Sequence, residues 1–178
     1  MHQLYFVILP EEIKTSEEAK AEARTQLDNN GFAGEGGYFT NCKADWYVTG
    51  GRWSGYLQET SLGIKFYDEV EKLIKPEDKF GFSNGEIEKN KTKIQSLWKK
   101  LGGKDKSPFH RDQYQSQGYE DDAMRITPKL LKALKKNKKG FEPKQLEVFD
   151  PEISEEINLS DLNKDHLKKW IVVIDYHN

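Results

Sequence analysis

Cysteine is almost absent from this chain of 178 residues, in which Cys42 is the single example. One cysteine excludes an intrachain disulfide and any zinc site built from several cysteines. The apolar run near the start, within residues 2–10, is too short for a membrane span and lacks the basic flank of a signal peptide. We therefore expect a cytoplasmic protein that does not enter a membrane.

A strong excess of either charge is also missing. Lysine and arginine total 28 against 30 aspartates and glutamates, so no global basic field attracts nucleic acid or anionic lipid. The chain is only 35% hydrophobic and is 33% charged, which requires an economical core. Aromatic residues, at 12%, compensate for this and argue against global disorder. Length and composition together predict a single domain over residues 1–178.

Two continuously apolar runs near the ends of the chain predict neighbouring central strands. "LYFVIL" stops at Pro10, and "WIVVIDYHN" closes the sequence. Runs of this kind are typical of strands that are buried on both faces. We expect residues 3–9 to pair with residues 170–176 in a small mixed or antiparallel sheet. The predicted fold class is α/β, of the α+β kind, with helices packed on one or both faces.

Helix signals occupy most of the sequence between these strands. Thr15 and Glu18 have the spacing of a capping box, and small or apolar residues then recur at every fourth position up to Leu27. Further helices are predicted at residues 64–74, 84–101 and 128–139, and a short strand at "LEVFD". We assign a lysine-rich helical insertion and a long polar loop to about residues 80–145.

The stretch "DWYVTGGRWSGYL", residues 45–57, predicts a β-hairpin over 44–57 that turns at Gly50-Gly51. Opposed residues of a hairpin share one face. This pairing places Trp46 and Trp53 together on an apolar face, where we expect both in the core. The opposite face then carries Asp45, Tyr47, Arg52 and Ser54.

That polar face is the predicted binding surface. Arg52 follows two glycines whose backbone N–H groups can point at an anion, and its planar guanidinium suits a phosphate. The candidate ligand-binding residues are Asp45, Tyr47, Gly50, Gly51, Arg52 and Ser54. The alternative is structural, with Arg52 paired to a carboxylate such as Asp175.

Asp175 and His177 form a second candidate constellation. They lie two apart on the last predicted strand, so their side chains leave the same face. Such a pair can bind a divalent metal, or act as an oriented catalytic base. Antiparallel pairing of the first and last strands would bring His2 close, and Asp121 or Asp122 of the long loop could complete a metal site. The alternative is a solvated chain end.

Several of these residues carry a family resemblance. The block Asp45-Trp46-Tyr47-x-x-Gly50-Gly51-Arg52-Trp53-x-Gly55 resembles small proteins of phage and bacterial genomes that have no established activity. The resemblance extends to Asp121-Asp122-Ala123-Met124 and to the terminal Asp175-x-His177, about a tenth of the chain in all. It implies candidate positions and no mechanism.

Three functions follow as hypotheses, and whether the protein is an enzyme stays open among them. The first is an accessory protein that binds a nucleotide or a nucleic-acid phosphate at the Gly-Gly-Arg turn. The second is a protein-interaction module that acts on a host factor, with the hairpin purely structural. The third is a metal-dependent hydrolase that uses Asp175 and His177. The lysines of residues 128–139 are expected to form a solvated face.

Overall fold

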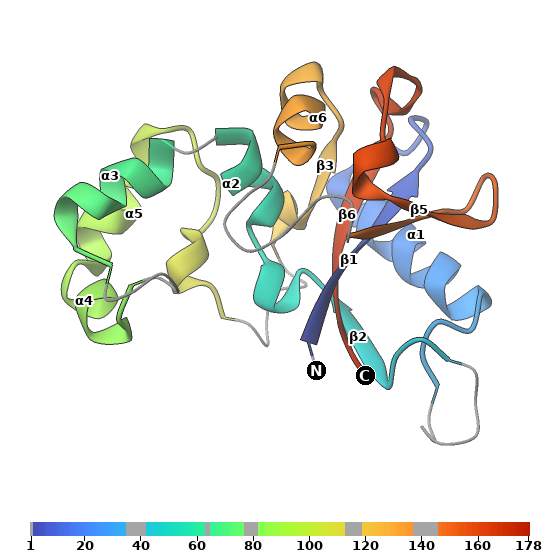
Figure 1. Cartoon of the computed structure of the whole chain (residues 1–178), viewed down its shortest axis with the longest axis horizontal. Helices are drawn as coiled ribbons and strands as arrows, with labels where there is room; N and C mark the ends of the chain where they lie inside the picture. Colours follow the sequence, from blue (N-terminus) through green and yellow to red (C-terminus); the bar gives the residue numbers. More distant parts are fainter. Residues whose placement is uncertain (1, 35–41, 63–64, 77–81, 113–118, 137–145) are drawn as a thin grey trace.

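The computed structural model describes residues 2–34, 42–62, 65–76, 82–112, 119–136 and 146–178, which form a mixed sheet with helices on both faces (Figure 1). The strands are β1 (His2–Leu9), β2 (Trp46–Thr49), β3 (Ala123–Arg125), β4 (Glu147–Asp150), β5 (Glu155–Asn158) and β6 (Trp170–His177). Their order is β2-β6-β1-β4-β5, and β3 also pairs with β6. The predicted α+β class is confirmed, and the strand predicted at "LEVFD" is β4.

The two terminal strands lie side by side at the centre of the sheet, as predicted. β1 and β6 are antiparallel, and their register runs from His2 opposite His177 to Leu9 opposite Trp170. Both strands are apolar on both faces because helices cover the sheet on each side. The N- and C-termini consequently lie next to each other, close to β2 (Figure 1).

Two apolar cores sandwich the sheet. The first lies under α1 (Ser16–Asn29), which begins at the predicted capping box of Thr15 and Glu18 and packs with Ala19, Ala23 and Leu27. The second core lies under α2 (Tyr56–Leu62) and α6 (Pro128–Leu134). Within the described residues, no helix has the length and apolar character that a membrane crossing requires.

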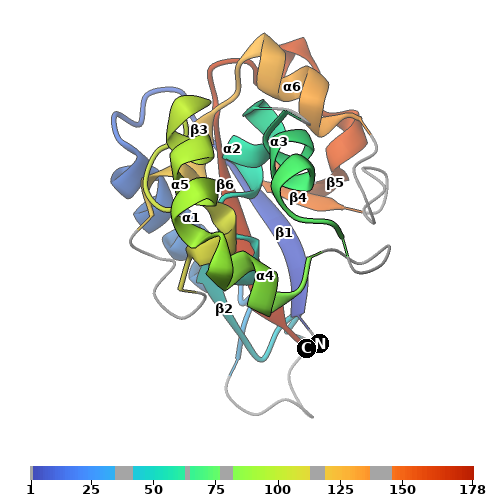
Figure 2. The same ribbon diagram turned by 90° about the vertical axis from the view of Figure 1, so that its left-hand side faces the viewer.

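A helical cluster stands apart from the sheet and has a core of its own. It consists of α3 (Lys65–Leu73), α4 (Asn84–Lys89) and α5 (Lys91–Lys100), packed around Phe66 and Trp98. Figure 2 shows these three helices in front of the sheet, with α2 between them and the strands. The helix predicted over 84–101 is broken at Asn90, whose side-chain amide donates to the Glu86 carbonyl over 3.0 Å.

The helical cluster differs in extent from the predicted insertion over residues 80–145. It begins earlier, at α3, whereas β3 and α6 belong to the sheet and its second core. Part of the predicted helix 128–139 lies outside the described residues, as do Ile64 and the middle of the long loop. The described 3-10 helices are η1 (Gly51–Trp53), η2 (Pro108–His110), η4 (Glu120–Asp122), η6 (Leu159–Asp161) and η7 (Lys164–His166).

The hairpin predicted over 44–57 is wrong. β2 pairs with the C-terminal half of β6, and after Gly50 the chain enters η1 and then α2. Gly50 donates its N–H to the Val173 carbonyl over 2.8 Å, so the turn is attached to β6 and not to a returning strand. β2 therefore pairs with β6, and not with residues 52–57 as the hairpin prediction required.

The expectation for the two tryptophans is wrong for Trp46. Trp53 packs at the margin of the second core, whereas Trp46 is 42% exposed. The reason is the same change of pairing, because Trp46 lies opposite His177 at the end of the sheet.

Candidate functional site

The Gly50-Gly51 turn is wrapped tightly around two buried carboxylates. Both glycines have positive φ, 78° and 54°, which side chains rarely adopt. A Cβ atom at Gly50 would overlap the carboxylate of Asp122, and one at Gly51 would overlap that of Asp175. The turn therefore requires glycine twice over, for its backbone angles and for its close approach to these two aspartates.

Asp175 fixes the far side of the turn. Its Oδ2 accepts the backbone N–H of Arg52 over 2.8 Å, and its Oδ1 lies 2.9 Å from Nδ1 of His2. The side chain is only 2% exposed, so both oxygens are occupied within the protein. In this turn the Arg52 N–H therefore bonds the protein's own carboxylate, whereas the Gly50 N–H bonds the Val173 carbonyl. Arg52 and Asp175 are thus joined, as one alternative expected, although through the backbone and not the guanidinium.

Asp122 lies at the centre of a second, fully buried network. Its carboxylate accepts from Ser54 Oγ at 2.8 Å and from the Gly55 N–H at 3.1 Å. Burial, with the negative charge of Asp121 second, raises the pKa of Asp122 to about 7 against the opposing effects of Ser54 and Arg111. The carboxyl group is therefore poised to change its charge near neutral pH.

Arg111 completes this network and has no signal in the sequence. Its guanidinium makes two parallel hydrogen bonds to the Asp121 carboxylate and a third, of 3.1 Å, to Ser54 Oγ. Burial raises the pKa of Asp121, and the Arg111 charge opposes that rise. Arg111 comes directly after η2 in an aperiodic polar stretch, so nothing in the pattern distinguishes it from a solvated arginine.

A partly exposed group of side chains lies beside the turn, at the end of the sheet. Trp46 stacks on His177 with ring planes 3° apart and centroids 5.7 Å apart, and the His2 ring meets both edge-on. Nδ1 of His177 lies 3.3 Å from Oδ2 of Asp45. With the exposed side chain of Arg52, these residues define what we call the edge patch: His2, Asp45, Trp46, Arg52 and His177.

The structure separates the predicted polar face into three places. Asp45 and Arg52 are exposed in the edge patch, whereas Ser54 is buried against Asp122. Tyr47 points to the opposite face of the sheet, where its hydroxyl donates to Asp28 of α1 over 2.6 Å. Burial first, and this carboxylate second, raise the pKa of Tyr47. Tyr47 therefore does not belong to the edge patch.

The candidate metal ligands are also divided. His2 lies close to His177, as predicted, with ring centroids 5.3 Å apart. Asp121 and Asp122, however, bond to Arg111 and Ser54, and in the described part of the chain no group of three histidine, cysteine or acidic side chains is placed to hold a metal ion. Divalent-metal binding stays a prediction that these contacts do not support.

The edge patch is separate from the two best-formed hollows of the described structure. Two hollows in the described structure, of about 540 and 240 Å³, lie beside α1 and beside Tyr5 and Lys43, and no edge-patch residue lines either one. The geometry of the turn and the patch is thus what supports an assignment of function. No known protein family, no curated protein and no solved structure matches the chain.

Proposed function

We propose that the protein binds a phosphate-bearing ligand, a nucleotide or a nucleic-acid phosphate, on the edge patch. The observation that supports this proposal is that Arg52 combines a fixed backbone with an exposed side chain. Its backbone is held by the hydrogen bond to Asp175, whereas its side chain is exposed and has no ion pair or side-chain hydrogen bond among the described residues. A guanidinium on a fixed backbone loses less freedom when it binds, and its fork matches two phosphate oxygens.

Hydrogen-bonding groups beside Arg52 support binding of an anion, against the charge of two nearby carboxylates, Asp175 and Asp45. Asp175 is buried beneath the patch, where His2 and the Arg52 N–H occupy its two oxygens. The exposed carboxylate of Asp45 lies beside His177. His2 and His177, both partly exposed, have Nδ1 against a carboxylate, so each can donate from Nε2 to a phosphate when both of its ring nitrogens carry a proton.

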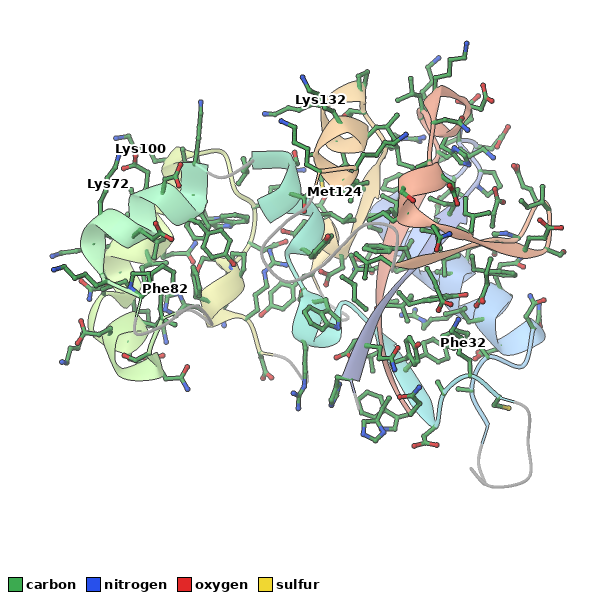
Figure 3. All side chains as sticks on the ribbon, viewed as in Figure 1. Phe32, Lys72, Phe82, Lys100, Met124 and Lys132 are labelled. Carbon is green, nitrogen blue, oxygen red and sulfur yellow. The ribbon has the colours of Figure 1, made fainter. Side chains whose placement is uncertain are left out.

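The test is the variant Arg52→Ala, with Lys132→Ala as its matched control. Lys132 lies on α6, at the far end of the molecule from β2 (Figure 3), so its loss removes a surface cation without touching the edge patch. The readout is the affinity for a fluorescein-labelled, 5′-phosphorylated oligonucleotide, measured by anisotropy at low and high salt.

We expect Arg52→Ala to weaken binding by about tenfold or more, because a hydrogen-bonded charge contributes about 1.5–3 kcal/mol. Its melting temperature should stay close to that of the wild type, since alanine keeps the N–H that bonds Asp175. Lys132→Ala should bind like the wild type. Equal affinity of Arg52→Ala and the wild type, or an equal loss in Lys132→Ala, would contradict the proposal.

One observation favours a second candidate function, the protein-interaction module. Trp46 is a large exposed apolar side chain, and aromatic residues of this kind often anchor protein interfaces. This function predicts that Trp46→Ser abolishes retention of one defined partner from a bacterial lysate and that Arg52→Ala does not. A wild type that retains no partner from the lysate would exclude it.

A further inference from the structure

We infer that the ligand of the edge patch is single-stranded nucleic acid, held by an unpaired base that stacks on Trp46. The inference rests on the proposed function and deepens it, because it names the group that lies beside the phosphate. The shared chemistry is a nucleobase next to a phosphate, which a free mononucleotide also offers. Single-stranded chains are favoured because they carry unpaired bases beside phosphates, which suit an exposed tryptophan and an exposed arginine attached to neighbouring positions of β6.

The indole of Trp46 is positioned by contacts with two histidine rings. His177 lies parallel to it on one side, and His2 meets it edge-on. Trp46 is nevertheless 42% exposed. A base that stacks on the indole removes apolar surface from water, and each stacked base in such complexes contributes about 1–3 kcal/mol.

Trp46 and Arg52 are attached to neighbouring positions of β6. Trp46 lies opposite His177 on β6, and the backbone N–H of Arg52 is bonded to Asp175. These two β6 positions are two residues apart, or about 7 Å at the rise of a strand. A base on Trp46 and a phosphate of the same or the next nucleotide at Arg52 can span this interval.

A duplex cannot use the patch in the same way. Its bases are already stacked and paired, so they present no free ring face except at the ends. The phosphates of a duplex remain available to Arg52, so duplex binding should depend on Arg52 and not on Trp46. This difference separates the inference from the proposed function on which it rests.

The experiment measures the affinities of a labelled oligonucleotide of about ten deoxythymidines and of a labelled two-strand duplex with no unpaired bases. The variants are Trp46→Leu, which keeps an apolar side chain without a ring, Trp46→Phe, which keeps a ring, and Arg52→Ala. We expect Trp46→Leu to weaken single-strand binding by about tenfold and Trp46→Phe to restore part of it. Duplex binding should be weak, and both Trp46 variants should bind the duplex with the affinity of the wild type. Arg52→Ala should lower the affinity for both the single strand and the duplex.

Two outcomes overturn the inference and leave the proposed function intact. In the first, Trp46→Leu binds the single strand like the wild type while Arg52→Ala does not. In the second, adenosine monophosphate binds and depends on Arg52, and the oligonucleotide does not bind. If Arg52→Ala binds every ligand as well as the wild type, the proposed function itself fails. Thermal melting of each variant confirms that the chain is folded.

Discussion

Asp122 shows how strongly its surroundings can shift the behaviour of one side chain. Its carboxyl group is completely buried, and the hydrogen bonds from Ser54 and Gly55 do not offset the cost of removing its charge from water. Burial raises its pKa from the ordinary 3.8 to about 7. The folded protein therefore retains a proton that the unfolded chain releases at lower pH.

This shift predicts the pH dependence of stability. Between pH about 4 and about 7 the folded state binds the extra proton, so the free energy of unfolding should fall as pH rises, by at most about 1.4 kcal/mol per pH unit. The stabilisation that the Asp122 proton contributes is fully present below pH 3.8, the ordinary pKa, and is lost as pH rises past the folded-state pKa of about 7. The measurement is urea unfolding of the wild type and of Asp122→Asn across this range.

The difference between the two proteins isolates Asp122 from the other titrating groups. The amide that replaces the carboxyl group in Asp122→Asn stays neutral at every pH, so the free energy of unfolding of the variant should lack the decline due to Asp122. The stability of the variant relative to the wild type should therefore increase as pH rises. A pH dependence that is identical in the two proteins, or a wild type that gains on the variant as pH rises, would contradict the assignment.

Single residues of the site could be predicted to different extents. The closeness of His2 and His177 followed from strand pairing, because register and the alternation of side chains are fixed by two apolar runs. Arg111 could not be predicted, since its role depends on a contact with Asp121 and Ser54 that no local pattern encodes. The exposure of Trp46 was mispredicted because a large aromatic residue is usually buried.

The Gly50-Gly51 turn is the element on which the site depends, and it gives the sharpest prediction for stability. In Gly50→Ala and Gly51→Ala, the turn places alanine at a left-handed backbone angle. The new Cβ atom would overlap the carboxylate of Asp122 at position 50 and that of Asp175 at position 51. We expect each variant to lose about 3 kcal/mol or more in the free energy of unfolding, or to fail to fold.

Gly31→Ala is the matched control for these variants. Gly31 has a similar φ of 63°, but no atom lies within 4 Å of the position of its Cβ. Its substitution should therefore cost only the backbone strain, about 1 kcal/mol. Urea unfolding curves of the three variants test this difference. Equal losses at Gly31, Gly50 and Gly51 would show that close approach to the carboxylates contributes nothing.

At the level of elements, prediction succeeded where the signal is local. The capping box starts α1, and long apolar runs form β1 and β6. The hairpin prediction was wrong because two glycines permit several tight turns. The turn that forms is selected by pairing with β6, which lies more than 100 residues later in the sequence. The break between α4 and α5 was missed because the apolar spacing continues across Asn90.

In the whole molecule, four separate regions of the chain meet at one end of the sheet. Residue 2, residues 45–55, residues 121–122 and residues 175–177 are brought together by the antiparallel pairing of β1, β2 and β6 and by the contacts of Gly50 and Gly51. The two buried aspartates stabilise the turn from within. They leave Arg52, Trp46 and the two histidines on the surface.

The location of the binding site can be tested most directly by nuclear magnetic resonance. Unlabelled single-stranded oligonucleotide is titrated into the full-length, ¹⁵N-labelled chain while the backbone amide and indole signals are followed. We predict the largest shifts at the Trp46 indole and at the amides of Trp46, Arg52 and His177. Shifts confined to the lysine-rich helices α5 and α6, with those signals unmoved, would contradict binding at the edge patch.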